Sequence, residues 1–311
     1  MKKYAIGTDI GGSHISSVLI DVENECIIAD SFSSQKVNNK NTAEIILTDW
    51  AIAINKTIVG INQEQIAGIG FAMPGPFDYE NGVARFTHEV AKYESLNGYN
   101  IGNELRFSLG LPDSVPFRFM NDATSFAVGE SWIGKAKKYN KIIAITLGTG
   151  FGSAFIESGI PILERNDVPK LGCVWHLPYK NGIADDYFST RWFIQEYIKK
   201  TGIVLPGVKE ISQNADNNPE IKSIFEEFGA GLGKFLAPWA KKFGAECIVI
   251  GGNMVGAYHL FGPHLEKELR NHGLSTQILL SELMELAAMV GSSKLMDNAF
   301  WNDVKPLLSK M

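Results

Sequence analysis

The sequence predicts an α/β protein with two lobes, because of its length and an internal repeat. The chain has 311 residues, of which 45% are hydrophobic, and this is enough for a large core and favours two lobes over one. Segments 4–21 and 141–157 share one design, in which an apolar strand enters a glycine-rich turn and a second strand returns. Their Gly-Ser pairs begin at residues 12 and 152, which is 152 − 12 = 140 residues apart. The repeat indicates an internal duplication of a nucleotide-binding lobe.

The composition disfavours nucleic-acid-binding and membrane proteins. The formal net charge is 29 − 34 = −5 without a long basic run, so a nucleic-acid surface is not indicated. No apolar segment approaches the ~20 residues of a membrane span, and Asp9 interrupts the first apolar run too early for a signal peptide. Cys26, Cys173 and Cys247 form no CxxC pair, which predicts neither a disulfide framework nor a zinc site and fits a reducing compartment. We therefore expect a soluble, cytoplasmic protein.

The first glycine turn is Asp9-Ile10-Gly11-Gly12-Ser13, between predicted strands at 4–8 and 15–21. Its glycines let the backbone approach a ligand closely, and successive N–H groups of such a turn can bind phosphate oxygens. Asp9 would be repelled by phosphate, so Mg²⁺ or its water shell is the expected intermediary. Taken alone, the motif is better explained as an ordinary hairpin turn.

The second glycine turn is Leu147-Gly148-Thr149-Gly150-Phe151-Gly152, between predicted strands at 141–147 and 153–157. Neither turn fits the dinucleotide-binding fingerprint, because both continue into a strand rather than a helix. Neither fits a Walker-type loop, because no lysine followed by serine or threonine closes it. Both remain candidates for phosphate binding.

Between the two turns in sequence, a predicted strand at 116–120 leads through Asn121 into a helix that opens at Asp122. A carboxylate flanked by two phosphate-cradling turns suggests a base that deprotonates a hydroxyl in front of a nucleotide's terminal phosphate. Taken alone, Asp122 is better explained as the N-cap of that helix, since aspartate is favoured at this position.

The other predicted elements of the N-terminal half are two helices and a strand. Asn41 and Glu44 indicate a helix start, and apolar residues then recur every fourth position from 46 to 58. An apolar strand at 66–73 ends in Pro74-Gly75-Pro76-Phe77-Asp78, which is either a rigid turn or one wall of a substrate pocket. A short helix covers 101–109 and is stopped by glycine and proline.

In the C-terminal half, residues 185–200 are predicted to be helical. Apolar residues from 219 to 243 follow a helical spacing, and Pro238 within them indicates a bend or two helices. A buried strand at 246–250 ends in Gly251-Gly252-Asn253, a position where α/β sheets admit ligands such as a planar adenine ring. The alternative is a tight strand-to-helix turn. An apolar helix at 283–296 is expected to pack back on the sheet.

The order of these motifs resembles the ROK family, which contains bacterial sugar kinases and related repressors of the actin/hexokinase/heat-shock ATPase superfamily. The resemblance runs from residue 4 to about residue 295, and five motifs in the same order carry it: Asp9-Ile10-Gly11-Gly12-Ser13, Pro74-Gly75-Pro76, Asn121-Asp122-Ala123, Leu147-Gly148-Thr149-Gly150-Phe151-Gly152 and Gly251-Gly252-Asn253.

The resemblance implies a fold and a site. It implies two ribonuclease-H-like lobes of the actin-like ATPase fold with a cleft between them. The first lobe would cover 1–120, with the C-terminal helix of about 285–311 packing back on it, and the second would cover 121–284. It implies Asp122 as general base and Mg²⁺ held near Asp9 through water. The implied sugar-binding residues are Gly75, Asn97, Asn121, Asp122, His176 and Asp185. The implied ATP-binding residues are Asp9, Gly11, Gly12, Ser13, Gly148, Thr149, Gly150, Gly152, Gly251, Gly252 and Asn253.

The sequence departs from the family at its sugar-binding motifs. The family's Gly-Glu-x-Gly-His motif reads Gly172-Cys173-Val174-Trp175-His176 here, so a thiol replaces a carboxylate and tryptophan replaces glycine. The zinc-binding cysteine cluster is missing, and we therefore expect no structural zinc. The Gly-Cys-Leu-Glu motif reads Gly182-Ile183-Ala184-Asp185, with a shorter carboxylate. Because a site built to hydrogen-bond a hydroxyl discriminates strongly, these changes put glucose itself in doubt as the substrate.

The expected activity is a glucokinase-like phosphorylation of a hexose or hexose derivative by ATP with Mg²⁺, most often at the 6-hydroxyl in this family. The alternatives are a weakly catalytic or non-catalytic sugar sensor, favoured by Cys173 and Trp175, and a kinase that uses polyphosphate. No basic track for a polyanion is visible, so ATP is preferred. A DNA-binding repressor is disfavoured, because the eight residues before Asp9 leave no room for a helix-turn-helix. The expected partners are a small sugar and ATP, without nucleic acid or membrane, and a homodimer stays open.

Overall fold

The computed structural model describes residues 2–88, 92–215 and 218–311. The chain divides into two compact units, the first formed by 1–134 and 285–311 and the second by 135–284. The sequence analysis placed the boundary after residue 120, whereas α3 (Asp122–Trp132) belongs to the first unit. The reason is that α3 packs against α9 (Leu286–Ser293) so closely that a Cβ atom on Gly129 would lie 1.9 Å from the carbonyl oxygen of Ala287.

The first unit is built on a mixed sheet with the strand order β3-β2-β1-β5-β8, and β4 also pairs with β2. β1 and β2 are antiparallel, whereas β1, β5 and β8 are parallel to one another. The predicted strands are therefore confirmed, with small shifts at their ends. The bounds are β1 Tyr4–Ile10, β2 His14–Asp21, β3 Cys26–Ile27, β4 Ser33–Lys36, β5 Ile66–Met73 and β8 Phe117–Asn121.

The second unit repeats this topology in its own sheet, which has the order β11-β10-β9-β14-β15. β9 and β10 form the antiparallel hairpin, and β9, β14 and β15 run parallel. The sequence repeat that predicted a duplicated lobe thus corresponds to two sheets of the same connectivity. The bounds are β9 Lys141–Leu147, β10 Phe151–Glu157, β11 Ile160–Pro161, β14 Cys247–Gly251 and β15 Gln277–Leu280.

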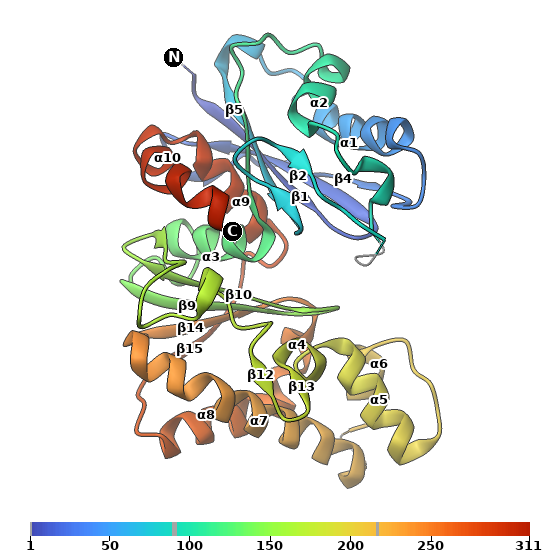
Figure 1. Ribbon diagram of the computed structural model, residues 1–311, viewed down its shortest axis with the longest axis vertical. Helices are drawn as coiled ribbons and strands as arrows, with labels where there is room; N and C mark the ends of the chain where they lie inside the picture. Colours follow the sequence, from blue (N-terminus) through green and yellow to red (C-terminus); the bar gives the residue numbers. More distant parts are fainter. Residues whose placement is uncertain (1, 89–91, 216–217) are drawn as a thin grey trace. The chain divides into compact units, whose positions relative to one another are not determined.

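Helices cover both faces of the first sheet, with α1 and α2 on one face and α9 and α10 on the other (Figure 1). Alternate residues of β2 follow this division, since Leu19 joins the core beneath α1 and Ile20 joins the cluster beneath α9. The predicted start of α1 at Asn41 is wrong, because the helix begins at Ala43 with Thr42 at the N-cap position. The bounds are α1 Ala43–Thr57, α2 Ile101–Leu109 and α10 Asn298–Val304; short elements are η1 Gln63–Gln65, β6 Phe77–Asp78, β7 Val83–Ala84, η2 Glu94–Leu96, η5 Lys294–Met296 and η6 Lys305–Lys310.

Two glycines allow α9 to lie directly on the first sheet. A Cβ atom on Gly7 of β1 would lie 1.9 Å from the carbonyl oxygen of Met289, and one on Gly70 of β5 would lie 1.9 Å from that of Ser292. No side chain fits into these spaces without displacing backbone. The predicted packing of a C-terminal apolar helix on the sheet is therefore confirmed, and it depends on these two residues.

In the second unit, α7 and α8 cover one face of the sheet (Figure 1). α7 is a single helix of 25 residues that contains Pro238, so the alternative of two helices is wrong. The predicted helix at 185–200 is interrupted at Phe188 and Ser189, which separate α4 from α5. The bounds are α4 Ala184–Tyr187, α5 Thr190–Thr201, α6 Val208–Ser212, α7 Pro219–Phe243 and α8 Tyr258–Asn271; short elements are η3 Lys170–Gly172, β12 Pro178–Tyr179, β13 Gly182–Ile183 and η4 Asn253–Ala257.

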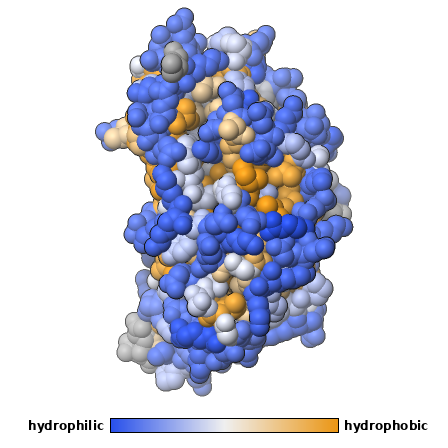
Figure 2. Space-filling view, turned by 90° about the vertical axis from the view of Figure 1, so that its left-hand side faces the viewer, coloured by the Kyte–Doolittle hydropathy of each residue, from blue (hydrophilic) through white to orange (hydrophobic). Residues whose placement is uncertain are grey.

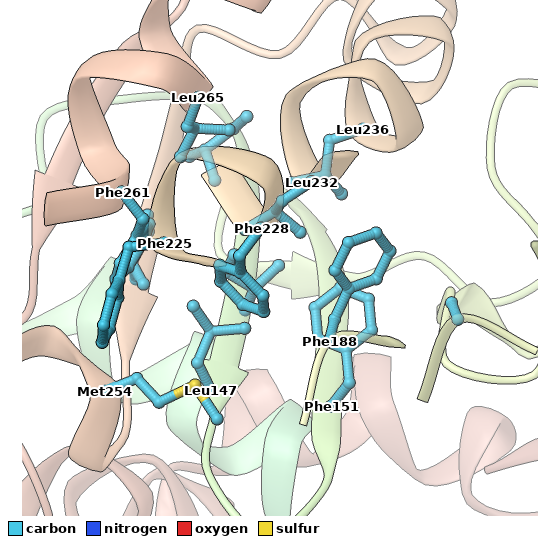
Figure 3. Packing of buried hydrophobic residues seen from close by; sticks show 14 of the residues in the cluster. Leu147, Phe151, Phe188, Phe225, Phe228, Leu232, Leu236, Met254, Phe261 and Leu265 are labelled. Atoms are coloured by element: carbon cyan, nitrogen blue, oxygen red, sulfur yellow. The ribbon is translucent and has the colours of Figure 1, made fainter. Parts of the chain in front are cut away.

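Aromatic side chains fill the core of the second unit. Phe225 and Phe228 of α7 pack near Phe261 of α8, and Phe151 and Phe188 lie side by side near Leu232 (Figure 3). All of these side chains are buried. The prediction that the aromatic residues of the 219–243 segment form core rather than a cofactor site is confirmed.

The face shown in Figure 2 is mainly hydrophilic, with hydrophobic residues in scattered groups. Among the described residues, no helix combines the length and the apolar character needed to cross a membrane.

Candidate functional site

The first glycine turn closes the β1–β2 hairpin, and side chains from two distant segments fix its carbonyl groups. The Gly11 N–H donates to the His14 carbonyl at 2.9 Å. Tyr93 Oη donates to the Gly11 carbonyl at 2.6 Å, and Asn39 Nδ2 donates to the Gly12 carbonyl. In the described part of the chain, the N–H groups of Gly12 and Ser13 have no acceptor. Fixed carbonyls beside free, successive N–H groups suit this turn to an anion.

Three carboxylates gather beside this turn. Burial and the charges of Asp122 and Glu285 raise the pKa of Asp9 to about 7. Burial also raises the pKa of Asp122, although the Ala123 N–H and the positive charge of Lys92 oppose the change. The sequence analysis missed Glu285. It precedes α9 by one residue and follows Asp122 by 163 positions, so only the return of the C-terminal segment brings the two together.

Asn121 is the N-cap residue of α3, so the side chain of Asp122 does not cap the helix. Asn121 Oδ1 accepts the Thr124 N–H at 3.1 Å, while its Nδ2 donates to Asp122 Oδ1 at 3.0 Å. The Ala123 N–H donates to the same Asp122 oxygen at 2.8 Å. The alternative explanation of Asp122 as the N-cap is therefore wrong. Its carboxylate is held through Oδ1, and neither of these two bonds engages Oδ2.

Lys92 is a second residue that the sequence analysis missed. Its Cε and Nζ atoms lie 3.3 and 3.6 Å from the position that a Cβ atom on Gly12 would occupy. Its charge lowers the pKa of Asp122, yet no carboxylate of the described residues lies within 4.0 Å of its ammonium group. Lys92 is brought to the turn by its neighbour in the sequence, Tyr93, whose hydroxyl binds the Gly11 carbonyl. Lys92 thus places a cation beside both the turn and Asp122.

Gly75 lies near Asn121, whereas no hydrogen bond in the described ranges connects the side chain of Asn97 to the residues around the first glycine turn. Tyr79 Oη is 3.5 Å from a Cβ position on Gly75, donates to the Met73 carbonyl at 3.0 Å and accepts from Asn121 Nδ2 at 3.3 Å. The segment after β5 is therefore connected to Asn121 through Tyr79. Asn97 is exposed after η2, and within the described ranges no hydrogen bond ties its side chain to these residues.

A cavity of about 560 Å³ adjoins the first glycine turn. Two of its lining residues, Asn39 and Tyr93, are the ones that hold the glycine carbonyls. The remaining lining residues are polar or charged, namely Lys40, His88, Glu94 and Ser95.

In the second unit, the glycine turn between β9 and β10 is fixed from the α4–α5 segment. The Gly148 carbonyl accepts both the N–H and the hydroxyl of Thr190, each at 2.8 Å. The Phe151 N–H donates to Asp185 Oδ1 at 2.6 Å. Arg191 pairs with the other oxygen of Asp185. Both carboxylate oxygens of Asp185, which was predicted to bind sugar, therefore have partners within this unit.

The Gly251-Gly252-Asn253 motif lies at the end of the neighbouring parallel strand. Gly251 pairs in register with Thr146 of β9. Gly252 has a φ of 87°, and a Cβ atom on it would lie 2.3 Å from the Leu147 carbonyl oxygen. Only glycine fits this conformation and this close approach. Two of the predicted ATP-binding motifs thus lie together at the carboxyl ends of β9 and β14.

The Cys173–His176 segment also belongs to the second unit. Cys173 Sγ is 3.7 Å from His176 Nδ1, and burial raises the pKa of the thiol to about 11. Burial and the charge of Lys170 lower the pKa of His176, which favours the neutral ring. Trp175 is 43% exposed and meets His176 edge-on. The Asp185 N–H donates to the Trp175 carbonyl at 3.0 Å, which joins this segment to α4.

The carboxylates of the first unit are compatible with Mg²⁺. No group of three or more histidine, cysteine, aspartate or glutamate residues in the described ranges has a metal-binding arrangement. Mg²⁺ commonly keeps several water ligands and uses one or two carboxylates plus substrate phosphates. The raised pKa of Asp9 reports repulsion from Asp122 and Glu285, in addition to burial, and a divalent cation would relieve it.

Comparison with known proteins extends over nearly the whole chain. Residues 5–299 match the ROK family. The chain is 25% identical to a glucokinase from Thermotoga maritima, covering 94% of this chain and 97% of the relative. It is 24% identical to the xylose repressor of Bacillus subtilis, covering 96% of this chain and 78% of the relative. The crystal structure of a ROK family glucokinase from Streptomyces griseus in complex with glucose and AMPPNP matches with a TM-score of 0.73 and 23% identity, covering 94% of this chain and 98% of that one. This chain belongs to the ROK family and has the actin-like ATPase fold of its sugar kinases.

Proposed function

We propose that this protein is an ATP-dependent sugar kinase that phosphorylates a hydroxyl group, the 6-hydroxyl, of a hexose or hexose derivative. The observation that carries the proposal is the setting of Asp122: a carboxylate of raised pKa, held through one oxygen, beside Lys92 and the first glycine turn. The similarity to glucokinases over nearly the whole chain supports sugar phosphorylation.

In this proposal, Asp122 is the general base. A raised pKa makes a carboxylate a stronger base near neutral pH. The Ala123 N–H and the Asn121 amide hold Oδ1, so the orientation of the carboxylate is set before the sugar binds. Asp122 takes the proton of the sugar hydroxyl, the hydroxyl oxygen forms a bond to the γ-phosphorus of ATP, and the bond from that phosphorus to the β–γ bridging oxygen breaks to release ADP.

In the first unit, the glycine turn is proposed to bind phosphates of ATP. The free N–H groups of Gly12 and Ser13 and the ammonium group of Lys92 offer donors and positive charge in the first unit. Thr149, Gly150 and the 251–253 turn are proposed for the second. Mg²⁺, held near Asp9 through water, would offset negative charge on the phosphates when bound.

The sugar is proposed to bind Asn121 and His176, with Gly75 in the wall of the pocket. The neutral ring of His176 can donate one hydrogen bond and accept another. Cys173 supplies a neutral thiol where the family resemblance gives a carboxylate, so one strong acceptor for a sugar hydroxyl is lost. This change is expected to alter which sugar is accepted. Asn97 stays a prediction from the resemblance.

A coupled assay of ADP release tests the proposal. Mg²⁺-ATP is offered with glucose, mannose, fructose, allose, N-acetylglucosamine, N-acetylmannosamine and several disaccharides, and inorganic polyphosphate replaces ATP in a parallel series. Asp122→Asn should lower the sugar-dependent release by about 10²–10⁴-fold. Asp113→Asn is the matched control, since this carboxylate of the same unit is fully exposed. Activity of Asp122→Asn equal to wild type would refute the role of Asp122.

A second function, a sugar sensor without turnover, is favoured by one observation. Cys173 and Trp175 alter the segment that the resemblance assigns to sugar binding, and the xylose repressor is among the relatives of this chain. Tight binding of a sugar, measured by calorimetry, without ADP release from ATP or phosphate transfer from polyphosphate, would support the sensor over the kinase.

A further inference from the structure

The carboxylate of Asp185 lies directly against the second glycine turn. Its Oδ1 atom accepts the Phe151 N–H at 2.6 Å and would lie 3.1 Å from a Cβ atom on Gly150. Its Oδ2 atom pairs with the guanidinium of Arg191. Both oxygens thus have a partner within the same unit, which fixes the carboxylate against the turn, whereas the family resemblance implies only a sugar-binding role for Asp185.

The same segment holds the turn at two further points. Thr190, next to Arg191 in sequence, binds the Gly148 carbonyl through its N–H and its hydroxyl. The rings of Phe151 and Phe188 pack edge-on with centroids 5.4 Å apart, and Figure 3 shows them side by side. The turn is therefore attached to the α4–α5 segment at Gly148, at the Phe151 N–H and through the ring contact of Phe151 with Phe188.

These attachments leave the middle of the turn for a ligand. The Phe151 N–H is used by Asp185, whereas the N–H groups of Thr149 and Gly150 have no acceptor in the described ranges. Asp185 also carries a negative charge that would repel a phosphate at this turn. Arg191 compensates that charge, because its guanidinium binds the oxygen that does not face the backbone.

We propose that Asp185, oriented by Arg191, is a positioning residue for the second glycine turn. It holds the turn in the shape that leaves the Thr149 and Gly150 N–H groups for a nucleotide phosphate. The proposal rests on the proposed function for the identity of its ligand, ATP. Its specific consequence is that loss of Asp185 weakens nucleotide binding.

Calorimetric titration with AMPPNP and Mg²⁺ tests this directly, because it needs no turnover. Asp185→Ala should raise the Kd for AMPPNP about tenfold or more, the size expected when a charge-assisted hydrogen bond that shapes the site is lost. Asp185→Asn keeps an acceptor for the Phe151 N–H and should lose less. Arg191→Gln should weaken binding in the same direction. Asp186→Asn is the matched control, since Asp186 binds the Ile183 N–H at 3.0 Å and not the turn.

The outcomes separate this inference from the proposed function. Thermal unfolding verifies the fold of each variant, and Asp185→Asn supplies the test if Asp185→Ala does not fold. An AMPPNP Kd for the Asp185 variants within twofold of wild type overturns the inference, and so does absence of AMPPNP binding to wild type. A selective rise in the KM of the sugar found by the assay, with AMPPNP binding unchanged, would make Asp185 a sugar ligand instead. If no sugar is phosphorylated, the AMPPNP titration still decides the role of Asp185.

Discussion

The raised pKa of Asp9 leads to a stability prediction whose sign and size can be derived. The pKa rises from an ordinary value of 3.8 to about 7, mainly through burial and then through Asp122 and Glu285. Between these two values, the folded chain keeps a proton that the unfolded chain has released. The free energy of unfolding therefore falls as the pH rises from about 3.8 to about 7 and stays reduced above that. At 1.36 kcal/mol per pKa unit, the cost at pH 8 is about 4 kcal/mol at most.

The perturbation is Asp9→Asn, which keeps the shape of the side chain and removes its charge. The variant should be more stable than wild type by up to about 4 kcal/mol at pH 8, and by only about 1.5 kcal/mol at pH 5, where less of the cost has developed. Urea unfolding at both pH values, followed by tryptophan fluorescence, measures the difference. Asp113→Asn is the control, because it removes a fully exposed carboxylate of the same unit.

The effect of Mg²⁺ on the free energy of unfolding is a second test of the same carboxylates. At pH 8 it should stabilise wild type more than Asp9→Asn, since a cation bound to the folded state relieves the repulsion that the variant lacks. A stability gain for Asp9→Asn that is equal at pH 5 and pH 8, or smaller at pH 8, would refute the raised pKa of Asp9.

Three further predictions concern the base, the cation and the packing of the first unit. Asp122→Asn should lower kcat by about 10²–10⁴-fold while calorimetry still detects sugar binding; loss of both would point to a damaged site. Lys92→Met should raise the KM for ATP and move the acid limb of the kcat/KM profile to higher pH, because the charge of Lys92 lowers the pKa of Asp122; an unmoved limb would contradict this. Gly7→Ala should cost more than about 3 kcal/mol, since its Cβ would overlap the Met289 carbonyl at 1.9 Å. Gly207→Ala, with an ordinary 3.4 Å contact, should change the urea midpoint little, and equal effects of the two substitutions would argue against the close approach of α9.

The sequence by itself determined the features that depend on residues near one another in the chain. Apolar runs predicted the strands of both sheets, and β9 follows its predicted bounds of 141–147. The two glycine turns predicted two hairpins, and the duplicated topology followed from them. These predictions succeed because strand formation and tight turns are governed mainly by local side-chain patterns and backbone freedom.

Where several local interpretations compete, the sequence alone did not identify the correct one. Aspartate and asparagine are both good helix caps, so only the structure assigned the cap of α3 to Asn121 and freed Asp122. The pattern from 185 to 200 is compatible with one helix, but the attachment of Thr190 and Asp185 to the glycine turn accompanies a break between α4 and α5.

Only the tertiary structure decided which charges share a site. Lys92 lies 30 positions before Asp122 in the sequence and Glu285 lies 163 positions after it, yet both act on the carboxylates beside the first turn. Likewise, the family resemblance implied that Asp185 binds sugar. In the structure its carboxylate binds the Phe151 N–H and the guanidinium of Arg191. Electrostatic and hydrogen-bonding interactions depend on distances through space, which the packing of α9 on the sheet and of the α4–α5 segment on its turn creates.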